Sequence, residues 1–118
     1  VVILHCVSAY QEVIEIKKEM KLTIPLIIHG FSKNIQVAES LYKNGFHLSF
    51  GKYLLRNPEL SEVFKSIPPE FIFLETDMIE ETIEDVYKKA TQLVGNSIER
   101  KIEENFKRIF NHNSLSDF

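Results

Sequence analysis

Two carboxylates follow an apolar segment of this chain at a spacing that lets both act in one site. Glu75 and Asp77 come directly after the run Phe71-Ile72-Phe73-Leu74. Because residues i and i+2 of an extended chain point the same way, both carboxylates can face one cavity. Burying charge beside an apolar strand is unfavourable unless a metal, a proton or a cationic group compensates. The simpler alternative is that one carboxylate caps the next helix while the other lies in water.

Two histidines occupy similar positions earlier in the chain. His5 follows Val1–Leu4 and His29 follows Leu26–Ile28, and both apolar runs are typical of buried strands. A single histidine at a strand end is more often a hydrogen-bonded structural residue than a ligand. Two such histidines together with Asp77 favour a metal site, since imidazole and carboxylate suit Zn, Mn, Ni or Fe, and Mg less well.

The elements that must position these side chains alternate between strand and helix. Strands are predicted at residues 1–4, 26–28, 46–50 and 71–74, and helices beginning near Ser8, Asn34, Glu59, Thr82 and Ser97. This α/β alternation predicts a parallel sheet with right-handed crossovers, whose strands end at one common edge. We therefore expect His5, His29 and Asp77 to lie within metal-bridging reach. His47, which begins its strand, is expected at the opposite edge.

Length and composition narrow the class of protein. A chain of 118 residues with 44 % hydrophobic content forms one domain or part of one, and we assign it to residues 1–111 with a flexible tail at 112–118. The sequence contains no long uncharged apolar run of the kind that predicts a membrane helix. Its net charge of -3 does not favour non-specific binding to nucleic acid. The single cysteine, Cys6, excludes an internal disulfide and fits a reducing, cytoplasmic compartment.

Six short motifs carry a resemblance to a known family. They are Ile3-Leu4-His5-Cys6, Ile27-Ile28-His29-Gly30-Phe31-Ser32, Leu48-Ser49-Phe50-Gly51, Leu55-Arg56-Asn57-Pro58, Phe73-Leu74-Glu75-Thr76-Asp77 and Glu104-Asn105-Phe106-Lys107-Arg108-Ile109-Phe110. In order and spacing they resemble the C-terminal part of TatD-family metal-dependent hydrolases. The resemblance implies strands five to eight of an amidohydrolase-like (β/α)8 barrel of the TIM type, with the first four strands outside this chain.

The resemblance also implies roles for the strand-end residues. His5 and His29 are the expected metal ligands of strands five and six. Asp77 is the expected ligand of strand eight and the catalytic residue that orients the attacking water, and Glu75 supports a ligand without binding metal itself. The implied cofactors are two divalent ions, such as Mg, Mn or Zn. The implied reaction is hydrolysis of DNA or another phosphodiester by metal-activated water, as in a DNA exonuclease.

Three further candidate residues lie outside the strand ends. Lys52 and Arg56, on the expected loop after the third strand, are possible phosphate contacts, with a solvated or helix-capping charge as the alternative. Phe31 either stacks on a base or packs in the core.

The sequence departs from the family pattern in two places. The family's opening His-x-His and its bridging glutamate belong to the front half, so the site in these residues is incomplete. Met78–Glu81 places an acidic stretch where relatives extend a loop toward substrate, which argues against nucleic-acid specificity more than against the metal chemistry. The alternative function is therefore an inert half-barrel that acts as a structural or partner-binding fragment. Alone, the four strands are expected to leave two open edges and an uncovered inner face, and to show no hydrolysis.

Overall fold

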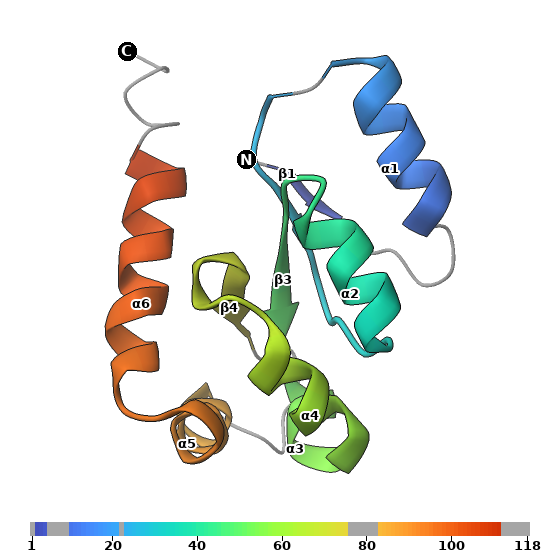
Figure 1. Ribbon diagram of the computed structural model, residues 1–118. Helices are drawn as coiled ribbons and strands as arrows, with labels where there is room; N and C mark the ends of the chain where they lie inside the picture. Colours follow the sequence, from blue (N-terminus) through green and yellow to red (C-terminus); the bar gives the residue numbers. More distant parts are fainter. Residues whose placement is uncertain (1, 5–9, 22, 76–82, 112–118) are drawn as a thin grey trace.

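A computed structural model describes residues 2–4, 10–21, 23–75 and 83–111 of the chain (Figure 1). Its strands are β1 (Val2–Leu4), β2 (Leu26–Ile28), β3 (Phe46–Phe50) and β4 (Ile72–Leu74). Its helices are α1 (Tyr10–Glu19), α2 (Ile35–Tyr42), α3 (Lys52–Arg56), α4 (Pro58–Ser66), α5 (Ile83–Val94) and α6 (Ser97–Phe106), with a 3-10 turn η1 (Pro69–Phe71) and a π turn η2 (Lys107–Asn111). None of the described helices combines the length and the apolar character needed to cross a membrane.

The four strands form one parallel sheet in the order β1-β2-β3-β4. This confirms the α/β architecture predicted from the alternation of strands and helices. β1 and β4 are the two edges of the sheet, and the carboxyl ends of all four strands lie along one side of it. Helix α6 packs against β4 and η1, whereas α1 packs against α2 at the other end of the molecule (Figure 1).

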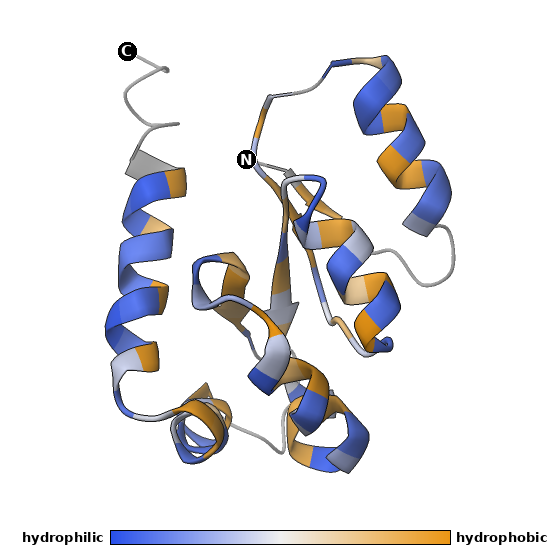
Figure 2. Ribbon diagram, in the orientation of Figure 1, coloured by the Kyte–Doolittle hydropathy of each residue, from blue (hydrophilic) through white to orange (hydrophobic). Residues whose placement is uncertain are grey.

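The hydrophobic core lies between the sheet and the helices. Phe46, Leu48 and Phe50 alternate along β3 and are fully buried. The helices are amphipathic, with hydrophobic and hydrophilic residues on different sides (Figure 2). The Phe50 ring contacts Phe31 from the β2–α2 loop and Phe64 from α4, both edge to face. This packing fixes the chain segments that follow β2 and β3.

Asparagine caps mark where two of the helices begin. The Asn34 side chain accepts a hydrogen bond from the Val37 amide, and Asn57 accepts one from Glu59. Pro58 occupies the first turn of α4, one residue before the predicted start, because its missing N–H costs nothing there.

Three boundaries differ from the sequence prediction. Lys52 and Arg56 lie on the short helix α3 and not on a loop. Phe71 belongs to η1, since the turn opened by Pro69 takes in the residue expected to begin β4. Ser97 is the first residue of α6 and not its cap, and Asn96 precedes it without a side-chain capping bond.

The inner face of the sheet is more covered than expected. Ile27, His47 and Phe73 are buried there, and only the edge residue Ile3 is widely exposed, at 52 %. The His47 ring packs against Phe73, which accounts for part of this cover. The predicted uncovered face is therefore wrong for β2 to β4, whereas β1 and β4 are the edge strands of the described sheet, as expected.

Candidate metal centre

One histidine and one carboxylate meet at the carboxyl edge of the sheet. His29 Nε2 lies 2.7 Å from Glu75 Oε2, and the Gly30 amide donates to Glu75 Oε1 at 2.8 Å. Glu75 therefore contacts both the His29 ring and the backbone amide of the next residue. Both side chains are largely shielded, with 24 % of His29 and 12 % of Glu75 exposed.

Backbone hydrogen bonds continue the strand ladders up to this pair. The Glu75 amide donates to the Phe50 carbonyl at 2.8 Å, and the His29 amide donates to the Leu4 carbonyl at 2.8 Å. These bonds extend the pairing of β3 with β4 and of β1 with β2 by one residue. The backbone of both site residues is therefore fixed by the sheet and not by a free loop.

Gly51 provides the space that Glu75 occupies. A Cβ atom on Gly51 would lie 2.9 Å from the Glu75 carbonyl oxygen and 3.0 Å from its Cγ. Contacts this short require something to move, and the first of these atoms is backbone. The glycine after β3 thus sets how closely the ends of β3 and β4 approach.

The described pair fits part of a metal centre. The His29 imidazole is a ligand that Zn and Mn accept in proteins, and Glu75, whose two oxygens contact the ring and the Gly30 amide, supports it. Within the described ranges, no three His, Cys, Asp or Glu side chains gather closely enough to hold an ion. His5 and Asp77 lie outside the described residues, so the expected convergence of His5, His29 and Asp77 stays a prediction. Cys6 and the stretch 78–81 also lie outside them.

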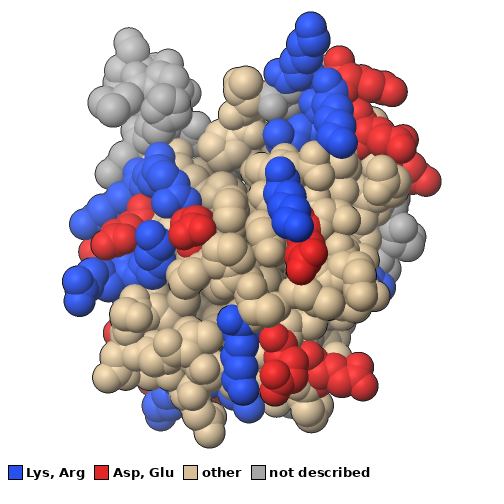
Figure 3. Space-filling view, viewed as in Figure 1, with Lys and Arg blue, Asp and Glu red and all other residues tan. Residues whose placement is uncertain are grey.

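The structure describes the other three residues that the sequence suggested for the site, Lys52, Arg56 and Phe31. Lys52 follows Gly51 directly, and its ammonium lies 5.2 Å from the centre of the Tyr53 ring. Arg56 is exposed at the last residue of α3. Phe31 is fully buried, which rules out base stacking in this arrangement. On the face drawn in Figure 3, basic and acidic side chains are intermixed.

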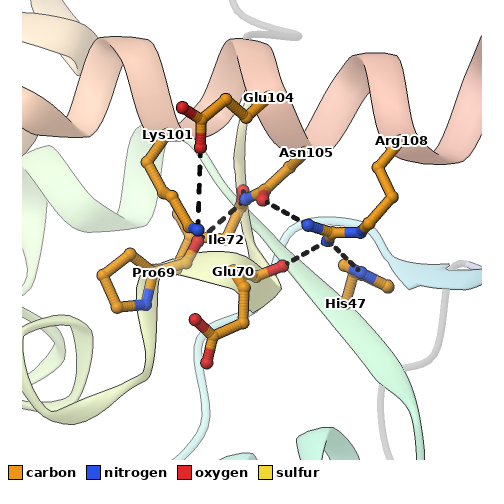
Figure 4. Close-up of polar contacts among 8 residues, drawn as sticks. All are labelled: His47, Pro69, Glu70, Ile72, Lys101, Glu104, Asn105 and Arg108. Carbon is orange, nitrogen blue, oxygen red and sulfur yellow. Dashed lines mark hydrogen bonds and ion pairs between the residues drawn. The ribbon is translucent and has the colours of Figure 1, made fainter.

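His47 lies at the opposite edge of the sheet, as predicted. Its Nε2 accepts from Arg108 at 3.3 Å (Figure 4). Its ring also contacts the rings of Phe71 and Phe73. Burial, followed by the nearby Arg108 guanidinium, lowers the pKa of His47 from 6.5 to about 4, and the Leu26 backbone acts in the opposite direction. Its buried Nδ1 makes no hydrogen bond of good geometry to a described residue. His47 is structural and neutral at pH 7, and it is remote from the candidate centre.

Asn105 and Arg108 connect α6 to the turn before β4 (Figure 4). Fully buried Asn105 donates to the carbonyls of Pro69 and Ile72 at 2.8 and 3.0 Å. Arg108 donates to Asn105 Oδ1 at 3.1 Å and to the Glu70 carbonyl at 2.8 Å. In the sequence these two residues stood out only as part of a motif. The pattern that could have identified Asn105 is its polar side chain within the buried helical stripe formed by residues 98, 102, 105 and 109.

Comparison with known proteins agrees with this geometry. A sequence model of the family described as TatD related DNase matches residues 1–111. The TatD homologue YJJV from Escherichia coli K12 superposes with a TM-score of 0.81 at 21 % identity, covering 92 % of this chain and 49 % of that one. A TatD-family hydrolase from Entamoeba histolytica superposes with a TM-score of 0.79 at 16 % identity, covering 91 % and 49 %. No curated protein matches. The chain thus spans about half the length of these solved structures.

Proposed function

The chain belongs to the family of TatD-related DNases, and from this premise we propose that it forms the C-terminal half of a metal-dependent phosphodiesterase. The observation that carries the proposal is the His29–Glu75 pair at the carboxyl edge of the parallel sheet. In open and closed α/β sheets alike, this edge is where catalytic groups gather. DNA or another phosphodiester is the proposed substrate, and the single cysteine supports a cytoplasmic location.

His5, His29 and Asp77 are the proposed ligands, with divalent ions such as Mg, Mn or Zn. When bound, such ions supply positive charge that polarises a phosphodiester and favours ionisation of water. Glu75 orients the His29 ring through their 2.7 Å contact, and the Gly30 amide holds Glu75 in turn. A ligand fixed in this way loses little conformational freedom on binding.

Asp77 is the proposed proton acceptor for the attacking water, because it follows Glu75 by two residues at the same strand end. Lys52 and Arg56 are proposed to contact the substrate phosphate, since α3 starts directly after Gly51, which abuts Glu75.

The segment alone is proposed to be inactive. The solved TatD structures are matched over 49 % of their chains, so four further strands are required to complete a barrel of this type. We propose that these strands, in the same or a second chain, carry the remaining ligands. An inert half-barrel that binds a partner is the alternative.

The test is Asp77→Asn in the complete protein, assayed on DNA ends and on bis(p-nitrophenyl) phosphate with Mg, Mn or Zn. An amide cannot accept the proton, so we expect turnover to fall by about 10² or more while the fold is retained. The control is Glu62→Gln, an exposed change on α4 that should leave turnover unaltered. Unchanged turnover of the Asp77 variant at saturating metal would rule out its role. Absence of metal-dependent hydrolysis in the unmodified complete protein would favour the inert half-barrel.

A further inference from the structure

Ser49 is a buried polar residue on β3 that the packing of the core does not explain. Only 5 % of it is exposed. Its backbone carbonyl accepts a hydrogen bond from the Phe31 amide at 2.9 Å, but its hydroxyl makes no hydrogen bond to a described residue. A buried hydroxyl without a partner lowers the stability of a protein, so its presence needs a reason other than stability.

The register of the sheet places Ser49 beside the candidate metal centre. Ile28 pairs with Leu48, the last such pair of β2 and β3. One residue further along both strands, His29 is level with Ser49. On the other side, Ser49 pairs with Phe73 of β4. Paired residues of a parallel sheet direct their side chains to the same face, so the side chain of Ser49 lies next to that of His29.

The Ser49 hydroxyl faces the open end of this inner face. Nδ1 of His47, two residues earlier on the same face, is sealed from solvent, whereas the Ser49 oxygen is not. Two residues after Ser49 comes Gly51, which has no side chain and abuts Glu75. The hydroxyl therefore lies at the floor of the candidate metal centre, below the contact between Glu75 and His29.

The chain around Ser49 carries positive charge and no carboxylate. Residues 46–56, which form β3 and α3, contain Lys52 and Arg56 but no aspartate or glutamate. Glu75 of the neighbouring strand is engaged by His29 at 2.7 Å. A hydroxyl can donate a hydrogen bond to the oxygen of an anion, and nearby cations favour the same anion. This side of the centre therefore suits an anionic oxygen better than a cation.

We propose that the Ser49 hydroxyl donates a hydrogen bond to an oxygen of the phosphate group held in the candidate metal centre. The inference deepens the proposed function and rests on it, since Lys52 and Arg56 are proposed there to contact the same phosphate. Long side chains of this kind leave the position of a phosphate variable. A short hydroxyl on a strand paired on both sides fixes the depth of the phosphate beside His29.

Ser49→Ala in the complete protein, loaded with Mg, Mn or Zn, tests this contact with inorganic phosphate as the probe. Phosphate should inhibit hydrolysis of bis(p-nitrophenyl) phosphate competitively. Its inhibition constant should rise about tenfold in the variant, because a hydrogen bond to a charged group is lost. The second readout is the increase in Tm that phosphate causes, which requires no turnover and should become smaller in the same variant.

Two further variants separate the hydrogen bond from a general effect on the fold. Ser49→Thr keeps a hydroxyl and should retain most of the phosphate binding. Ser61→Ala removes a serine that is also buried, with 8 % exposed, but that lies on helix α4 outside the sheet. It should leave both the inhibition constant and the increase in Tm unchanged.

Each outcome decides the proposal. Equal inhibition constants for the wild type and Ser49→Ala would overturn it and leave the proposed function intact. Equal losses in Ser49→Ala and Ser61→Ala, or no effect of phosphate on the wild type, would also overturn it. Stabilisation by phosphate that depends on Ser49, in a complete protein without hydrolase activity, would support the contact and count against the proposed function.

Discussion

Glu75 contacts four residues at the carboxyl edge of the sheet: His29, Gly30, Phe50 and Gly51. Its carboxylate contacts His29 and the Gly30 amide, its own amide binds the Phe50 carbonyl, and its Cγ abuts Gly51. These contacts tie together the ends of β2, β3 and β4. The orientation of the His29 ring therefore depends on residues that never need to touch substrate.

Gly51→Ala tests this dependence. The added methyl carbon would lie 2.9 Å from the Glu75 carbonyl oxygen, so the ends of β3 and β4 must separate. We expect a loss of about 1–3 kcal/mol of folding free energy and a shift of the His29 ring nitrogen signals in NMR spectra of the folded protein. Gly95→Ala is the control, since Gly95 has a φ of 98° but no atom within 4 Å of the added carbon. It should be destabilising without shifting the His29 signals. Unshifted His29 signals in both variants would contradict the role of Gly51.

His47 gives stability a defined pH dependence. Its pKa falls from 6.5 to about 4 on folding, so between these values the unfolded chain binds more protons than the folded one. The contribution of His47 to the free energy of unfolding is fully present above pH 6.5. As the pH falls toward 4 this contribution is lost, which lowers the free energy of unfolding by at most about 3 kcal/mol. Denaturant unfolding of the wild type and of His47→Gln at pH 7 and 4.5 measures this. The stability difference between the two should decrease at the lower pH, because His47 is the one titratable group that the two proteins do not share. A difference that is the same at both pH values would contradict the assignment.

At the scale of elements, α6 is attached by Asn105 as well as by its apolar stripe. The Asn105 amide donates to two carbonyls, that of Pro69 in the turn before β4 and that of Ile72 at the start of β4. Asn105→Leu keeps a similar volume but removes the donor to the Ile72 carbonyl, the acceptor for one Arg108 N–H and one of the two donors to the Pro69 carbonyl. We expect a loss of about 3 kcal/mol in denaturant unfolding. Glu104→Ala, an exposed change on the same helix, should alter stability by less than about 0.5 kcal/mol. Equal effects of the two variants would show that the Asn105 bonds contribute nothing specific.

The strands and their order along the sheet were predictable because hydrophobic runs and helix patterns are local. The start of α2 at the Asn34 cap follows from side chains that bond within three residues. Helix α3 was missed because its five residues follow Gly51 with no side-chain cap. Phe106 follows Ile98 and Ile102 at four-residue spacing, yet it is 52 % exposed, because a helical stripe shows which residues share a side and not how far the neighbouring layer extends.

The position of the candidate centre at one edge of the sheet was predictable from the sequence, but the contacts within the centre were not. A strand end locates His29 and Glu75 at one edge, since parallel strands share their direction. Their 2.7 Å approach depends on the register of β2, β3 and β4 and on the absence of a side chain at Gly51. The His47–Arg108 bond joins residues 61 positions apart, and no local pattern relates them.

At the scale of the whole molecule, apolar surface remains exposed at both ends of the sheet. Ile16 and Met20, one turn apart at the end of α1, are 50 % and 64 % exposed, and Ile3 on the edge strand β1 is also exposed. At the other edge, Phe106 of helix α6, which packs against β4, is 52 % exposed. A sheet with unpaired apolar edges offers backbone donors and acceptors to any other chain.

We therefore expect the 118-residue chain alone to associate. Sedimentation velocity should show dimers or larger species at micromolar concentration, with weak metal binding and no hydrolysis, because half of the proposed barrel is absent. Ile16→Glu combined with Met20→Glu should shift the distribution toward the monomer, since charge on the α1 surface opposes its burial against another chain. Glu19→Gln, on the exposed side of the same helix, is the control and should leave the distribution unchanged. A cooperatively melting monomer that binds metal tightly would contradict the half-barrel interpretation, because four strands would then suffice for both the fold and the site.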